Sequence, residues 1–295
     1  MYFGSVRFFK HLIVFVVLLL IFGLAIATVC LTVFNKNYKE QISDMRSVTV
    51  LAQSNPVEDK NHKGSLSIEY QELYPDMYAK LAKATRTEPK TVYLTFDDGP
   101  SPRTAEILDV LKQEDVKATF FIIGREGERE KDLMKRIVDE GHTLGIHTYS
   151  HVYTSIYTSV EAYLADFYQT YQLIQDTTGV KPEIFRFPGG SLNSYNRQDY
   201  QEIIAEMTRR GFTYYDWNAS SGDASAKPTA ASVYSNTVQS SKNKDRIILL
   251  MHDSVGKTCT VAALPQIIEY YKSQGYKFER ITNDVTPVIF AYADY

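Results

Sequence analysis

Two stretches of this 295-residue sequence combine residue types that could hold a metal ion and move protons. Two adjacent carboxylates, Asp97 and Asp98, end an apolar run in TFDDGPS, and His147 and His151 are four residues apart in HTYSHV. On one helical turn, a spacing of i and i+4 lets two imidazoles converge on a single ion. Two imidazoles and one carboxylate leave an open coordination position for water, as in catalytic zinc sites. These residues are therefore candidates for a metal site with an open position for water.

A third candidate, His252, follows the apolar run IILLM. It could act as a general acid, or it could be a core histidine with a satisfied hydrogen bond. The first two motifs also have simpler interpretations, because HxxxH pairs are common and an Asp pair before Gly-Pro could belong to a turn. Consecutive residues of a strand point to opposite faces. If Asp97 and Asp98 do chemistry, we therefore expect different roles, one as a metal ligand and one as a base.

The segments that carry these residues alternate between strands and helices from Thr91 onward. Strand-like runs occur at 91–96, 118–123, 142–147, 184–187, 212–217, 246–251 and 277–281. Amphipathic helical stretches lie between or after them at 103–114, 128–140, 159–178, 197–210, 229–242 and 260–274. This alternation is typical of parallel βαβ units. Six or seven such units favour a barrel over a short open sheet.

Polar side chains end five of these predicted strands. They are Asp97 with Asp98, His147, Arg186, Asp216 and His252. In parallel α/β folds the functional site lies at the carboxyl ends of the strands. We therefore expect these side chains to gather in one place.

The motifs TFDDGPS, HTYSH, RFPGGS, YYDW and LLMHD occur in this order, each at a predicted strand end. Together they resemble the polysaccharide deacetylase family, also called the NodB-homology family or carbohydrate esterase family 4, over residues 88–285. The resemblance implies a distorted (β/α) barrel of about seven strands, which agrees with the alternation above. It also implies a hydrolase with one divalent metal ion. A His₂Asp site suits Zn²⁺, with Co²⁺ or another first-row metal as alternatives.

The resemblance further implies a role for each matching residue. Asp98, His147 and His151 would bind the metal. Asp97 would be the catalytic base, and His252 would be the general acid that protonates the leaving group.

Other residues would support these groups. The resemblance implies that Arg186 orients the base, and that an acidic residue in DWNASSGD orients the acid. Asp216 and Asp223 are both candidates for the second role, and resemblance to the peptidoglycan-type members favours Asp223. Trp217 and Leu250 would shape the groove that holds the acetyl group.

The stretch RFPGGS departs from the Arg-Pro-Pro-Tyr-Gly of many family members. The backbone N–H that serves the oxyanion would fall near Gly189 or Gly190, where glycine permits close approach, but no tyrosine would help to shape the site. The form with two glycines resembles the peptidoglycan N-acetylglucosamine deacetylases of Gram-positive bacteria, which predicts removal of N-acetyl groups from peptidoglycan.

Alternative functions use the same residues. An esterase for O-acetylated polysaccharides such as xylan, or a deacetylase of chitin or poly-N-acetylglucosamine, would need the same site. An inactive glycan-binding protein is a different class, which the presence of base, ligands and acid argues against. The net charge of −3 gives no basic excess, so we expect no nucleic-acid partner.

Residues 12–34 are uncharged and, at about 1.5 Å per residue, long enough to cross a bilayer core of roughly 30 Å. We predict a transmembrane signal anchor here, because a cleaved signal has an apolar region of only about 7–15 residues. Arg7 and Lys10 precede the span, although Lys36 and Lys39 weaken the orientation bias. We expect residues 1–11 in the cytoplasm and the rest outside, at the cell membrane of a Gram-positive bacterium.

The predicted organisation after the anchor has three parts. Residues 35–87 form an extracellular stalk with a short helix after residue 66, residues 88–285 form the catalytic domain, and residues 286–295 form a C-terminal tail. Cys259 is the only cysteine outside the span, which excludes an intramolecular disulfide there. The expected partners are a glycan polymer and the membrane, and the sequence leaves the oligomeric state open.

Overall fold

The computed structural model describes residues 69–80 and 85–290, all within the compact unit Leu66–Tyr295. The predicted span at 12–34 and most of the predicted stalk lie outside the described residues. Within the described ranges, no helix is long and apolar enough to cross a membrane.

A parallel sheet forms the centre of the unit. Its strands are β1 (Thr91–Asp97), β2 (Thr119–Ile122), β3 (Thr143–Ile146), β4 (Ile184–Phe185), β5 (Thr213–Tyr214), β6 (Ala219–Ser220), β7 (Arg246–His252) and β8 (Lys277–Phe278). Seven of them follow the order β5-β4-β3-β2-β1-β7-β6, and β8 pairs with the first residues of β1. Asp97 and His252 are the last residues of β1 and β7, so both lie at the carboxyl end of the strands.

The sheet is strongly curled, because a short segment joins its two edge strands. β5 and β6 lie at opposite ends of the order, yet only residues 215–218 connect them. Such a segment spans at most about 18 Å, whereas seven flat strands about 4.8 Å apart would place the edges roughly 29 Å apart. The sheet is therefore a half-barrel, consistent with the predicted distorted barrel.

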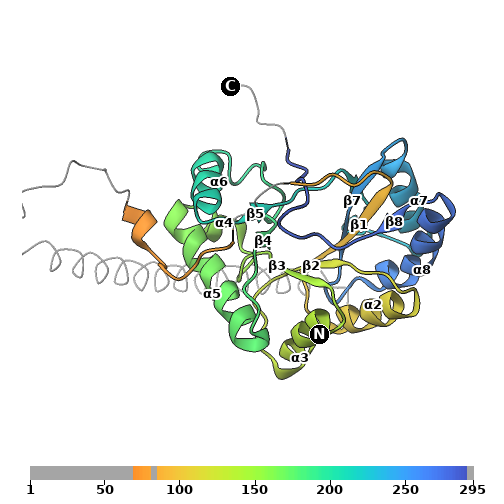
Figure 1. Ribbon diagram of the computed structural model, residues 1–295, viewed down its shortest axis with the longest axis horizontal. Helices are drawn as coiled ribbons and strands as arrows, with labels where there is room; N and C mark the ends of the chain where they lie inside the picture. Colours follow the sequence, from red (N-terminus) through yellow and green to blue (C-terminus); the bar gives the residue numbers. More distant parts are fainter. Residues whose placement is uncertain (1–68, 81–84, 291–295) are drawn as a thin grey trace, which may run out of the picture. The chain divides into compact units, whose positions relative to one another are not determined.

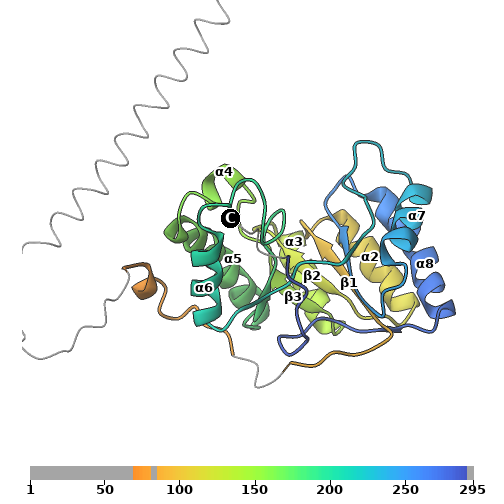
Figure 2. The same ribbon diagram turned by 90° about the horizontal axis from the view of Figure 1, so that it is seen from above.

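Helices surround the outer side of this half-barrel (Figures 1 and 2). They are α2 (Pro102–Gln113), α3 (Glu128–Asp139), α4 (Tyr153–Ile156), α5 (Val160–Thr178), α6 (Tyr200–Arg209), α7 (Ala230–Ser241) and α8 (Thr258–Ser273). Neighbouring helices contact one another in the sequence α7, α8, α2, α3, α5, α6 around the sheet. The N-cap of α2 is Ser101, in a capping box with Thr104, so the helix begins directly after the TFDDGPS turn.

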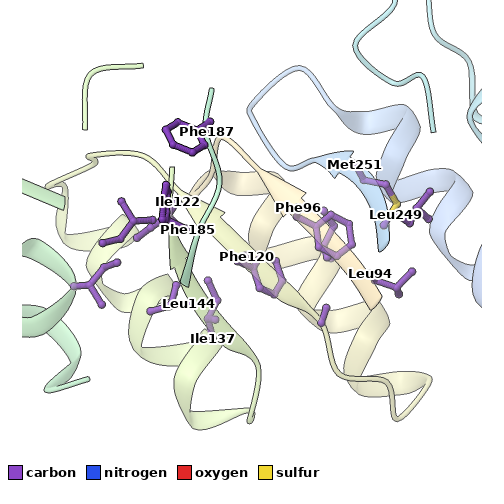
Figure 3. Packing of buried hydrophobic residues seen from close by; sticks show 14 of the residues in the cluster. Leu94, Phe96, Phe120, Ile122, Ile137, Leu144, Phe185, Phe187, Leu249 and Met251 are labelled. Carbon is purple, nitrogen blue, oxygen red and sulfur yellow. The ribbon is translucent and has the colours of Figure 1, made fainter. Parts of the chain in front are cut away.

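The side chains of β1 alternate between the two faces of the sheet, as the sequence predicts. Leu94 and Phe96 belong to the large core between sheet and helices, which Figure 3 shows in close-up. Tyr93 belongs instead to a smaller cluster on the concave side. Thr95 and Asp97 share the face of Tyr93, so the predicted base points into the curl and away from the main core.

All seven predicted strands occur, but several are shorter than predicted. The predicted strand 212–217 is reduced to β5, because Tyr215 to Asn218 cross the open side of the half-barrel to reach β6. β6 and α4 were not predicted, since these two- and four-residue elements lie outside any longer run of apolar or β-branched residues. The short helix expected after residue 66 is the 3-10 turn η1 (Glu69–Glu72).

Residues on the N-terminal side of the predicted domain 88–285 also pack against it. The guanidinium of Arg210, fully buried on the C-cap of α6, donates to the backbone oxygens of Tyr70, Leu73 and Tyr74 and to Glu206. At the other end, Arg86 forms a parallel β-bridge with Val285. The N-terminal segment of the described unit is thus fixed to the domain by a buried charge.

Candidate active site

The carboxylates of the two adjacent aspartates both lie near the same histidine. Asp97 is the last residue of β1, and Asp98 has a φ of 76°, in the left-handed region. The Nε2 atom of His147 lies 3.7 Å from Asp97 Oδ2 and 3.7 Å from Asp98 Oδ1. The expectation that strand alternation alone separates the two carboxylates is therefore wrong, because the chain leaves the strand at Asp98. They differ instead in their other partners.

Asp98, His147 and His151 form a cluster that fits a metal ion. One ligand atom from each lies within 4.8 Å of the others, and His151 Nε2 is 3.4 Å from Asp98 Oδ1. This oxygen is buried and accepts no hydrogen bond in the described part of the chain. A buried carboxylate oxygen facing two imidazoles is a donor set suited to Zn²⁺ or a similar ion.

The tautomer of His147 supports the same interpretation. Its Nδ1 lies 2.8 Å from the backbone oxygen of Arg186, which can only accept, so Nδ1 carries the proton. Nε2 then presents its lone pair to the cluster. Burial lowers the pKa of His147 to about 3, so the ring is neutral at physiological pH. A carbonyl oxygen that fixes the free ring nitrogen is the usual support of a metal-binding histidine.

His147 and His151 approach each other across a loop, and not across the predicted helical turn. The chain leaves β3 at Ile146 and enters α4 only at Tyr153. Between them, Thr148 and His151 have φ values of 70° and 57°. Two left-handed residues turn the backbone so that the second imidazole returns toward the first.

The predicted base, Asp97, is almost fully buried and bound to a buried arginine. Arg186 Nη1 donates to Asp97 Oδ1 at 2.9 Å, and the guanidinium lies over the ring of Phe121. Arg186 is itself held by the backbone oxygen of Tyr215 and the hydroxyl of Thr95. Burial raises the pKa of Asp97, while the charge of Arg186 opposes this rise. A carboxylate with a raised pKa and a fixed orientation is suited to accepting a proton.

The predicted acid, His252, lies beside the base on the neighbouring strand. β1 and β7 pair in parallel with Asp97 opposite His252. His252 Nδ1 lies 2.7 Å from Asp223 Oδ1, and Asp223 Oδ2 accepts from Thr260 and from the backbone of His252. Burial lowers the pKa of His252, but the hydrogen bond and charge of Asp223 outweigh it, so the pKa is raised overall.

Of the two aspartates left open by the sequence, only Asp223 contacts His252. Asp216 accepts hydrogen bonds from the backbone of Ser191 at 2.8 Å and of Phe290 at 2.7 Å. The hydroxyl of Ser191 also donates to Asp216 Oδ2, at 2.5 Å. Asp216 therefore joins the β4–α6 loop to the C-terminal segment. This connection could not be predicted from the sequence, because Ser191 and Phe290 are both far from Asp216 along the chain.

Two of the four predicted groove residues, Gly189 and Gly190, lie in the loop that follows β4. Gly189 and Gly190 have φ values of 75° and 86°, so both need the left-handed freedom of glycine. The N–H of Gly190 donates to the backbone oxygen of Phe187, whereas that of Gly189 meets no acceptor among the described residues. Of the two, Gly189 therefore offers the free donor. Trp217 lies edge-on to Phe290, and Leu250 is buried on β7.

Two aromatic residues of this groove were not singled out from the sequence. A Cβ built on Gly190 would lie 2.4 Å from the ring of Phe290, and one built on Gly189 would lie 2.9 Å from the ring of Tyr153. The expectation that no tyrosine shapes the site is therefore wrong. A tyrosine two residues after His151 was visible in the sequence, but its contact with Gly189 depends on the unpredicted helix α4.

Comparisons with known proteins agree with this geometry. A family model described as polysaccharide deacetylase matches residues 84–214. YheN of Bacillus subtilis (strain 168), named for polysaccharide deacetylation, is 33% identical over 256 residues, covering 85% of this chain and 86% of YheN. The chain belongs to the polysaccharide deacetylase family. Its enzymes are hydrolases that depend on a metal ion.

Two further members of the family are similar in sequence or structure. A peptidoglycan-N-acetylglucosamine deacetylase of Bacillus cereus is 36% identical over 196 residues, covering 65% of this chain and 69% of that protein. The catalytic domain of a peptidoglycan N-acetylglucosamine deacetylase from Eubacterium rectale superposes with a TM-score of 0.68 at 35% identity, covering 72% of this chain and 98% of that domain. The family resemblance predicted from the five motifs is confirmed.

Proposed function

We propose that this protein is a membrane-anchored, metal-dependent deacetylase that removes N-acetyl groups from N-acetylglucosamine residues of peptidoglycan and releases acetate. The proposal rests on the two ion pairs that orient the base and the acid. Arg186 holds Asp97, and Asp223 holds His252, on adjacent strands beside the Asp98, His147 and His151 cluster. Two similar relatives are named for this substrate.

The residues of the site divide the reaction between them. Asp98, His147 and His151 would hold the metal, which would polarise a water molecule and the acetyl carbonyl group when bound. Zn²⁺ suits this donor set, and Co²⁺ is the alternative. Asp97 takes a proton from the attacking water, with its carboxylate aimed by Arg186. The N–H of Gly189 donates to the oxygen that gains negative charge.

His252 completes the reaction by donating its proton to the leaving amine nitrogen. Amines are poor leaving groups unless protonated, so an acid opposite the base is needed. Asp223 raises the pKa of His252, which favours its protonated form, and holds the ring in one orientation. Trp217 and Leu250 enclose the acetyl group. Beside Asp98 lies a cavity of about 290 Å³, which Arg125 and Ser254 also line.

The direct test is acetate release from purified peptidoglycan, with and without a chelator. We expect release that stops with the chelator and returns when Zn²⁺ is added. Parallel assays with acetylated xylan and with N-acetylglucosamine oligosaccharides separate the alternatives. Release from acetylated xylan but not from peptidoglycan would replace the proposal with an O-acetyl esterase. Glycan binding without acetate release under saturating metal would indicate an inactive binding protein.

The anchoring proposal rests on the uncharged run 12–34. With residues 1–11 in the cytoplasm, the catalytic domain would face the cell wall of a Gram-positive bacterium. Protease treatment of intact protoplasts tests this topology. We expect cleavage of the domain from outside. Protection in intact protoplasts together with cleavage after lysis would place the domain on the other side.

A further inference from the structure

Tyr153 occupies the space that a side chain at position 189 would need. A Cβ on Gly189 would lie 2.9 Å from Tyr153 Cε1 and 3.1 Å from its hydroxyl oxygen. A larger residue at 189 and this orientation of Tyr153 therefore exclude each other. The Arg-Pro-Pro-Tyr-Gly pattern named in the sequence analysis would place a tyrosine at position 189, whereas here an aromatic ring reaches this place from α4.

The ring of Tyr153 is held by its neighbours. It packs edge-on to His151 with ring centres 5.3 Å apart, and it contacts Tyr157 and Tyr195 at 6.0 Å and 5.2 Å. Tyr157 is anchored in turn, because its hydroxyl donates to the backbone oxygen of Pro188 at 2.8 Å. α4 is thus tied to the loop after β4, and Tyr153 has a defined position between a predicted metal ligand and Gly189.

The hydroxyl of Tyr153 makes no hydrogen bond to any residue that the structure describes. The half-buried side chain therefore presents a free O–H donor beside Gly189, whose N–H is also free. Two unused donors lie together next to His151. In acyl-transfer sites, donors placed in this way stabilise the oxygen on which negative charge develops.

We propose that Tyr153 is a further catalytic residue, whose hydroxyl donates a hydrogen bond to the acetyl oxygen of the substrate beside the N–H of Gly189. The proposal rests on the proposed function only in requiring an acetylated substrate, since amide and ester acetyl groups both provide this oxygen. The hydrogen bond strengthens as the carbonyl oxygen becomes an oxyanion, so it should act on turnover more than on substrate binding.

The test compares Tyr153→Phe with the unchanged protein and with Tyr168→Phe as a matched control. Tyr153→Phe keeps the ring contacts and removes only the free hydroxyl. Tyr168→Phe makes the same chemical change on α5, where the hydroxyl meets Asp76. We expect kcat of Tyr153→Phe to fall on the order of 100-fold with KM within twofold. Metal content and the melting temperature of the metal-free protein should stay unchanged, and the control should keep its kcat.

A second measurement separates this proposal from the choice of substrate. A methylphosphonamidate of glucosamine carries an anionic oxygen on a tetrahedral centre, like the reaction intermediate. Calorimetry with the zinc-loaded protein should show weaker binding to Tyr153→Phe by a factor similar to the loss of kcat. This holds even if peptidoglycan is not the substrate, in which case kcat is measured on the polymer that releases acetate.

Three results would overturn the proposal. The first is a kcat of Tyr153→Phe within about threefold of the parent, and the second is equal affinity of both proteins for the phosphonamidate. The third is a loss of kcat accompanied by loss of metal, because Tyr153 would then only position His151.

Discussion

At the scale of single residues, metal binding and the roles of base and acid are assigned to different side chains that lie close together. Asp97 and Asp98 are neighbours, yet one is bound by Arg186 and the other faces two histidines with an unpaired oxygen. The repulsion between them is offset on one side by a guanidinium and on the other by the metal that the cluster would hold. Substitutions should therefore have different effects on rate and on metal content.

Replacing the base should remove activity without removing the metal. We expect Asp97→Asn to lower kcat on the order of 100-fold or more, because the amide cannot accept the proton of water. Metal content, measured by elemental analysis, should remain stoichiometric. Turnover close to that of the parent would exclude Asp97 as the base.

Replacing a ligand should remove the metal itself. Asp98→Ala or His147→Ala leaves only two donors, so we expect substoichiometric metal after purification and no acetate release. The protein should still fold, as judged by its circular dichroism. Full metal content in either variant would refute this ligand set.

The pair of His252 and Asp223 makes a prediction about pH. A general acid must be protonated, so activity falls as the pH rises through its pKa. Asp223 raises the pKa of His252. In Asp223→Asn this contribution is lost, the pKa falls, and the alkaline limb of the kcat profile should move to lower pH. An alkaline limb at the same pH would show that Asp223 does not tune the acid.

At the scale of elements, short irregular segments carry the chemistry and long regular ones hold them. β1 and β7 pair over seven residues and fix Asp97 opposite His252. The β3–α4 and β4–α6 loops, with left-handed residues at 148, 151, 189 and 190, bring the remaining groups to the same edge. The positions of these loops depend on the helices that flank them.

The contact of α6 with the N-terminal segment should be important for stability. Arg210 is fully buried, pairs with Glu206, and satisfies three backbone oxygens of residues 70–74. We expect Arg210→Ala to destabilise the fold by about 3 kcal/mol, since these groups lose their buried donor. Chemical denaturation measures this change. A loss below about 1 kcal/mol would show that Arg209 alone satisfies Glu206 and that the segment contributes little.

At the scale of the whole molecule, every proposed catalytic group lies within the unit Leu66–Tyr295. The half-barrel is open where residues 215–218 cross between its edges, and the C-terminal segment packs there. The backbone N–H of Asp216 donates to the backbone oxygen of Val288, and the Asp216 carboxylate accepts from the backbone N–H of Phe290. The ring of Phe290 contacts Trp217 and Gly190. The end of the described chain is thus part of the groove wall.

Two truncations test this view of the whole molecule. Deleting residues 1–65 should leave kcat/KM on soluble N-acetylglucosamine oligosaccharides within twofold, because the site lies within the remaining unit. Deleting residues 288–295 should raise KM severalfold and lower the melting temperature, because Asp216 loses two backbone partners. Equal KM values for both truncated proteins would show that the C-terminal segment does not shape the groove.

The sequence by itself determined the parallel βα order, the strand ends that carry polar groups, and the identity of the metal, base and acid candidates. It could do so because strand periodicity and motif order are local properties of the chain. Only the tertiary structure decided between Asp223 and Asp216, replaced the helical turn of His147 and His151 with a left-handed loop, and placed Tyr153 against Gly189. These depend on contacts between residues distant in sequence, which no local pattern encodes.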